Sequence, residues 1–128
     1  MPSIPFVTQT VSIASGASAM AAALDTEGWM VAALELPSGL QGSFLEIRTG
    51  DTATVRRVFL SDASAATAAM LKLPSDVSSA AVILQVEPLL TLGRQFISLN
   101  TVQSDGTTAQ TQSAARSIKV FLVKPGSF

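Results

Sequence analysis

The chain has 128 residues, a formal net charge of −1 and only 13% charged residues. It contains no Cys, His or Tyr, which excludes disulfides and thiolate metal sites and removes the commonest general base, metal ligand and phenolic acid. The weak net charge argues against the basic surface stripe of a nucleic-acid-binding protein. We therefore expect one domain that buries a core without disulfide bonds or metal ions, is not an enzyme and has no cofactor.

The low share of charged residues also bears on assembly. An average soluble domain has about 25% charged residues, and a surface poor in charge promotes association. We therefore expect other subunits to cover much of the surface, with a small Ala-rich monomer as the alternative. No apolar run reaches the ~18 residues of a membrane helix. Residues 1–6 lack the basic and apolar regions of a signal peptide, so we expect synthesis in the cytoplasm and no membrane partner.

The chain begins with a segment that is expected to be extended. Two prolines within residues 1–6 favour a polyproline-like arm over a strand inside a sheet. Ile4 and Phe6 would let this arm lie on a neighbouring subunit, and a frayed terminus is the alternative. Residues 7–128 are expected to form the single domain.

The first strand is predicted over residues 7–14, where Val and Ile alternate with Thr and Ser. Residues 19–24 are expected to form a second short strand, although their Ala content also permits a helical turn. The stretch around which the chain is organised follows at residues 28–37, which are mostly apolar, opened by Gly and closed by Pro. Such a short, bounded run predicts a strand buried on both faces within a two-layer β structure.

Two further strands are predicted in the middle of the chain, over residues 43–49 and 54–60. The second contains Arg56 next to Arg57. Neighbouring side chains on a strand point to opposite faces, so at least one face here is wet or meets a partner.

Residues 61–73 permit two interpretations. Asp62 could cap a short Ala-rich helix. A polar loop followed by a strand over residues 69–73 fits as well, and it is the interpretation we prefer.

The last three strands are predicted over residues 80–86, 94–100 and 117–124, with a long polar hairpin or loop over residues 102–115. The chain thus contains about seven or eight short strands separated by turn residues. This spacing predicts an all-β fold, either an antiparallel β-sandwich or a jelly roll.

Several phrases along the chain carry a resemblance. These segments are residues 10–18, residues 23–28, the central strand that ends in Leu36-Pro37, residues 45–48, residues 95–99 and the polar-to-strand segment of residues 112–120. In these phrases the chain resembles small β-sandwich structural proteins encoded among the virion genes of tailed bacteriophages. It departs from that family's usual middle, where an Asp-Gly and a Tyr often follow the fourth strand.

The resemblance implies a virion component that assembles with copies of itself and with other structural proteins. The leading expectation is a capsid decoration (cement) protein, a homo-oligomer with a trimer as the expected state, that clamps neighbouring major capsid subunits. A neck, tail or fibre-associated component is the alternative. A third interpretation is a lectin-like module that binds host glycans through Trp29 or residues 102–115.

Candidate contact residues follow from these patterns: Ile4, Phe6, Trp29, Arg56 and Arg57 are expected to touch other subunits or the capsid. For Trp29, at the opening of the central strand, a core or subunit contact is favoured over an exposed sugar platform. The arginine pair is expected to be solvated or salt-bridged unless it meets phosphate or an acidic subunit surface.

Arg116 follows the polar segment and begins the last strand. A guanidinium at this place can bind backbone carbonyls and support the loop. Asp25 and Glu27 are assigned to a turn, because a hard cation usually needs more oxygen ligands than two side chains supply. No metal site is expected.

Overall fold

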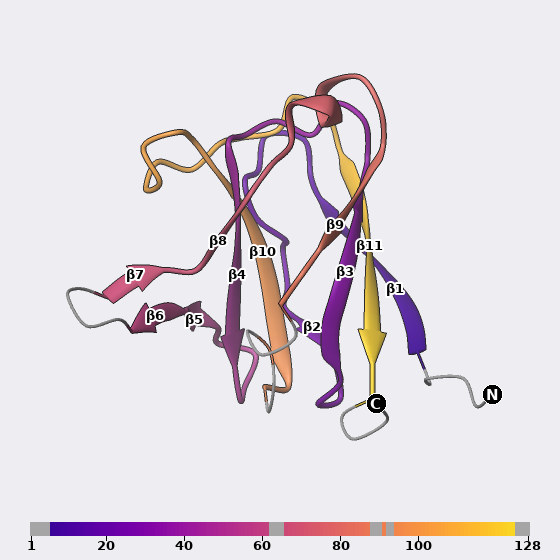
Figure 1. Ribbon diagram of the computed structural model, residues 1–128, viewed down its shortest axis with the longest axis vertical. Coiled ribbons are helices and arrows are strands. Elements are labelled where there is room, and N and C mark those ends of the chain that lie inside the picture. Colours follow the sequence, from indigo (N-terminus) through magenta and orange to yellow (C-terminus); the bar gives the residue numbers. More distant parts are fainter. Residues whose placement is uncertain (1–5, 62–65, 88–90, 92–93, 125–128) are drawn as a thin grey trace.

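Figure 1 shows a computed structural model of the chain, and the structure describes residues 6–61, 66–87, 91 and 94–124. These residues form two antiparallel sheets that face each other, which confirms the predicted all-β sandwich. None of the helical segments in these ranges has the length and apolar character that crossing a membrane would need.

The first sheet has the strand order β1-β11-β3-β9, and the second has β2-β10-β4-β5 with β8 also paired to β4. The first sheet consists of β1 (Phe6–Ile13), β11 (Arg116–Val123), β3 (Met30–Leu36) and β9 (Val82–Gln85). The second consists of β2 (Leu24–Asp25), β10 (Phe96–Val102), β4 (Phe44–Gly50), β5 (Arg56–Arg57) and β8 (Met70–Lys72). A separate hairpin is formed by β6 (Phe59–Ser61) and β7 (Ala66–Ala68), and a 3₁₀ turn, η1, spans Ser75–Ser78.

The core lies between the inner faces of the two sheets. Successive side chains on a strand point to opposite faces, so every second residue of each long strand points inward. The buried inward side chains of the long strands include Leu34, Leu36, Leu45, Ile47, Ile97, Leu99, Ile118, Val120 and Leu122. Burial of each such side chain contributes roughly 1.5–3 kcal/mol relative to leaving it exposed.

The central strand β3 is buried on one face, and not on both as its apolar run predicted. Glu35, on the outer face, is partly exposed and lies opposite Lys119, with 3.6 Å between Oε2 and Nζ. The pairing of β3 with β11 shifts register once, between Phe121 and Leu122. This bulge turns both Val31 and Leu34 toward the core.

The first strand begins earlier than predicted. Phe6 is already paired with Val123 in β1, so it belongs to the sheet and not to an arm, while Ile4 lies outside the described residues. Residues 19–24 form only a single bridge at Ala19 before the two-residue β2. Their small Ala side chains offer little surface to pack on a neighbouring strand, which explains why no longer strand forms.

The strand predicted over residues 54–60 breaks into β5 and β6 at Val58. The break arises because β5 pairs with β4, whereas β6 pairs with β7. The helix considered for residues 61–73 is wrong for the described part of that segment, which forms β7 and β8. Asp62 lies outside the described residues.

The polar segment between β10 and β11 is not a hairpin between neighbouring strands. Because β10 belongs to the second sheet and β11 to the first, residues 103–115 cross from one sheet to the other. Buried Gln112 holds this crossover. Its side-chain nitrogen donates to Gln41 O at 2.7 Å and to Thr101 Oγ1 at 3.0 Å, and its side-chain oxygen accepts from Gln41 N at 2.9 Å.

The main chain beside this amide extends the same network. Gly16 N donates to Gln112 O at 2.7 Å, and Gln112 N donates to Ala17 O at 2.9 Å. Ser113 N donates to the side-chain oxygen of Gln41 at 2.7 Å. The loop after β1, the loop after β3 and the crossover are therefore joined to one another, and a buried polar network satisfied in this way favours a single arrangement.

We expect Gln112→Ala to lower the free energy of unfolding by about 2–4 kcal/mol, because the backbone groups of Gln41 lose their partners inside the protein. Urea denaturation measures the change. The matched control is Gln103→Ala, whose exposed amide makes one long hydrogen bond in the same crossover, and it should shift stability by no more than about 0.5 kcal/mol. Equal losses in the two variants would contradict the role assigned to Gln112.

Candidate functional site

The second sheet forks at one edge of β4. Along this edge β8 pairs with residues 44–46, and β5 pairs with Arg48 and Thr49. At the junction Ala69 N donates to Val58 O at 2.8 Å, and beyond it β6 and β7 pair only with each other. Figure 1 shows this hairpin projecting from the side of the sandwich, at the left. The place where β5 and β8 leave β4 is named the fork below.

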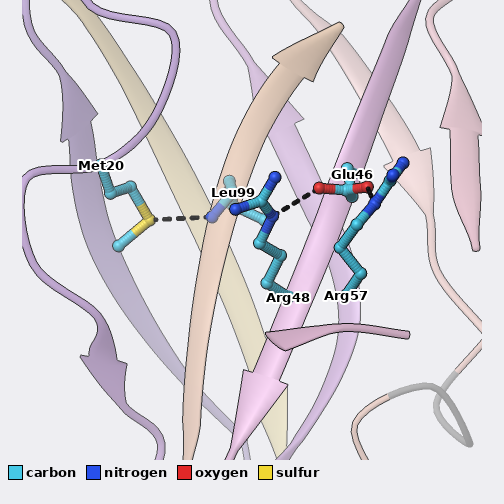
Figure 2. A network of polar contacts seen from close by, with 5 residues as sticks. All are labelled: Met20, Glu46, Arg48, Arg57 and Leu99. Atoms are coloured by element: carbon cyan, nitrogen blue, oxygen red, sulfur yellow. Dashed lines mark hydrogen bonds and ion pairs between the residues drawn. The ribbon is translucent and has the colours of Figure 1, made fainter. Parts of the chain in front are cut away.

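A buried carboxylate lies at the fork. Glu46 of β4 has a side chain that is only 2% exposed, and its two oxygens accept hydrogen bonds from Arg48 Nε and Arg57 Nε, each at 2.6 Å. Figure 2 shows the carboxylate between the two guanidinium groups, one from β4 and the other from β5. The arginine side chains are 40% and 35% exposed, so they reach solvent while the carboxylate does not.

The position of Glu46 follows from the strand pairing. Arg48 and Arg57 lie directly opposite each other in the β4–β5 pair, and like charges at opposite positions destabilise a sheet. Glu46 offers both of them an opposite charge. Burial raises the pKa of Glu46, but the hydrogen bonds and charges of the two arginines together outweigh it, and the net pKa lies below the usual value. The ionised carboxylate therefore holds β5 against β4.

A hollow of about 640 Å³ opens beside the fork, lined in part by Arg56, Arg57 and Arg94, with Asp51 as its acidic residue. Arg94 Nη1 lies 3.3 Å from Asp51 Oδ1 in an exposed ion pair, and Arg57 is bound to Glu46. Arg56 is exposed and makes no ion pair with any described residue. The hollow is therefore polar with an excess of positive charge, which suits a carboxylate on a partner surface.

Phe59 of β6 lines the same hollow and is 55% exposed. The guanidinium carbon of Arg57 lies 5.8 Å from the centre of its ring, which is a cation–π contact. Aromatic and arginine side chains are enriched together at protein–protein contacts. Arg56, Arg57, Phe59 and Arg94, named the fork surface below, form the strongest candidate contact site in the described part of the chain.

The other contact residues predicted from the sequence lie elsewhere. Phe6 is strongly exposed at the edge of the first sheet, and Trp29 is half-buried and packs against the core. Arg116 donates from Nε to the side-chain oxygen of Gln112 at 3.3 Å, and its Nη1 lies 3.1 Å from where a Cβ on Gly39 would be. Arg116 thus contacts the crossover through a side-chain amide and not through a backbone carbonyl.

Two acidic turn residues accept hydrogen bonds from their own turns. Asp25 accepts one from the backbone N–H of Glu27 at 2.8 Å. Hydrogen bonds from the Thr108 hydroxyl and from the backbone N–H groups of Thr107 and Thr108 lower the pKa of Asp105 to about 2. No group of three or more acidic residues that could hold a metal ion occurs in the described ranges.

The sequence pointed to Arg56 and Arg57 but not to Glu46, Phe59 or Arg94. Glu46 precedes Arg48 by two positions, so both side chains lie on one face of a strand. This spacing alone could have indicated a local ion pair. Nothing local indicates that a second arginine reaches the same carboxylate, because that contact depends on which strand pairs with β4.

Comparison of the chain with protein-family models, with curated protein sequences and with solved structures gives no match. The resemblance to phage β-sandwich proteins therefore remains an expectation that rests on the quoted sequence phrases. The fork and its surface are observations on this chain alone.

We expect Glu46→Gln to lower the free energy of unfolding at pH 7 by about 1–3 kcal/mol, because two facing arginines lose their shared counter-charge. The folded-state pKa of Glu46 is lowered from 4.5, so its contribution is fully present above that value and disappears as the pH falls through the folded-state pKa. The difference between wild type and variant should therefore shrink in acid. Urea denaturation at several pH values measures it.

Glu35→Gln is the matched control for this experiment. Its carboxylate makes a longer and more exposed ion pair with Lys119, at 3.6 Å, and its loss should change stability by at most about 1 kcal/mol. If the Glu46 and Glu35 variants behave alike at pH 7, the carboxylate at the fork does not have the structural role assigned to it.

Proposed function

We propose that the protein is a structural component of a tailed-bacteriophage virion, and more specifically a decoration (cement) protein that binds the outside of the capsid and stabilises the shell. Support comes from the resemblance of its sequence phrases, from its charge-poor composition and from its β-sandwich fold. Its partners in this proposal are the major capsid protein and other copies of the chain.

The fork surface is the observation that carries the proposal. Arg56, Arg57 and Arg94 are three of only eight basic residues in the chain, yet they line one hollow together with the exposed ring of Phe59. A contact at this place would bury an aromatic anchor and set arginines against acidic side chains of the partner. These are the residue types that dominate the binding energy at protein interfaces.

The ion pairs at the fork also order the side chains of this surface before binding. Glu46 holds Arg57 in place before any partner arrives, and Arg57 in turn lies over Phe59. Side chains that are already ordered lose less conformational entropy on binding. A protein that binds assembled capsid subunits more tightly than separated ones stabilises the assembled shell by mass action.

The proposal is tested with purified capsids that lack this chain. Added protein should bind them in numbers comparable with the capsid subunits and should raise the temperature at which the shells open. Binding of far fewer copies, confined to one vertex or to the tail, would replace the decoration role with a neck or tail role. A chain with no affinity for any part of the particle would contradict a virion role.

We expect Phe59→Ala to weaken capsid binding at least tenfold, which corresponds to about 1.4 kcal/mol. Arg56→Ala should weaken binding most at low salt, where the arginine is least screened. The matched control is Ile83→Ala, which removes a side chain of similar exposure, 59% against 55%, from the first sheet. Equal losses for Phe59 and Ile83 would mean that the fork surface is not the contact.

A further inference from the structure

Among the described residues, the outer edge of the first sheet is formed by β1, which has a partner strand on one side only. Its pairing with β11 runs without interruption from Phe6 opposite Val123 to Ile13 opposite Arg116. In Figure 1 this strand lies at the right-hand margin of the sandwich. Alternate N–H and C=O groups of such a strand point away from the sheet and can pair with another chain.

Strand β1 lacks the features that usually protect a sheet edge, which are charged residues, proline, a bulge or a very short strand. It contains no charged residue and no proline, the first charged residue of the chain is Asp25, and its register has no bulge. The opposite edge of this sheet, β9, has four residues, and the edge strand β2 has two. With eight residues, β1 is the longest unprotected edge in the described part of the chain.

We propose that β1 pairs antiparallel with β1 of a second copy of this chain, around a two-fold axis at Thr10, so that the two first sheets join into one. An uncharged strand can lie beside itself without like-charge repulsion. The charged residue opposite Thr10 is Lys119 on β11. The two copies of Lys119 would be three strand spacings, about 14 Å, apart, a distance over which salt screens most of their repulsion.

The faces of the sheet restrict the register to axes centred on a residue, and an axis at Thr10 near the middle of β1 pairs hydroxyl with hydroxyl and apolar with apolar side chains at most positions. A two-fold axis perpendicular to the sheet keeps both inner faces on the same side, so each residue meets one from the same face. With Thr10 opposite its own copy, the remaining pairs are Thr8 with Ser12, Val7 with Ile13, and Gln9 with Val11. Hydroxyl side chains at opposite positions stabilise a pair of strands. Val7, which is 39% exposed in the single chain, gains an apolar neighbour.

This contact goes beyond the proposed function and departs from the trimer expected from the sequence. A strand that pairs with its own copy around a two-fold axis closes at two subunits. The contact lies at the edge of the first sheet. The residues of the fork surface lie on β5, on β6 of the separate hairpin and just before β10, and none of them is in the first sheet. Because the experiments below use the isolated chain, failure of the dimer is distinguishable from failure to bind capsids.

Thr10→Cys tests the axis directly, because the chain has no Cys of its own. Opposite residues in an antiparallel pair have Cα atoms about 4.5–5.5 Å apart, which lies within the roughly 4.4–6.8 Å that a disulfide spans. Mild oxidation should convert this variant to a covalent dimer on a non-reducing gel. Gln85→Cys, on the exposed opposite edge of the sheet, should remain monomeric on the same gel, and equal cross-linking of both variants would contradict the proposal.

A second test uses charge and measures mass by sedimentation. Thr10→Glu faces Lys119 within its own chain, so the fold is retained, but across the axis two carboxylates meet, and the affinity of the dimer should fall at least tenfold. Thr10→Lys should weaken it similarly, and an equimolar mixture of the two should form a mixed dimer. Gln85→Glu should dimerise as wild type does. A wild-type chain that sediments as a monomer or a trimer, or a Thr10→Glu variant that dimerises normally, would overturn the proposal.

Discussion

The buried carboxylate of Glu46 is the constraint on which the candidate contact site depends. Arg48 and Arg57 face each other across β4 and β5. Without their shared counter-charge, repulsion between the two arginines would oppose the pairing of β5 with β4, which leads into the projecting hairpin. The same ion pairs orient Arg57, which lies over Phe59 and lines the hollow beside the fork. Glu46 thus supports both the pairing of β5 with β4 and the position of Arg57 on the fork surface.

Gln112 has a comparable effect on the inner side of the sandwich. Thr101, which accepts a hydrogen bond from its amide, is fully buried, and the residue opposite it on β4, Leu45, belongs to the core. The crossover that Gln112 holds is the route by which the chain passes from the second sheet back to the first. The second sheet is therefore held by a polar group on each face, the ion pairs at the fork and the amide network toward the core, and the Glu46 and Gln112 side chains at their centres are both buried.

Binding at the two proposed contact surfaces depends on different physical interactions. The fork surface combines an aromatic ring with positive charge, so binding there is expected to weaken as salt increases. The edge of β1 has no charge, and its proposed pairing depends on backbone hydrogen bonds and on Thr and Ser side chains, so salt should affect it little. The two surfaces share no residue, and none of the fork surface lies in the first sheet.

The sequence by itself determined that the chain is all-β and which residues of several strands point inward. Alternation is a local property, so Leu45 and Ile47, or Ile118 and Val120, could be assigned to one face before any partner strand was known. What only the tertiary structure decided was the pairing. The bulge beside β3 and the crossover held by Gln112 join segments far apart in the chain. The split of one predicted strand and the second arginine on Glu46 depend on which strand pairs with β4. No short stretch of sequence contains the partner that each of these contacts requires.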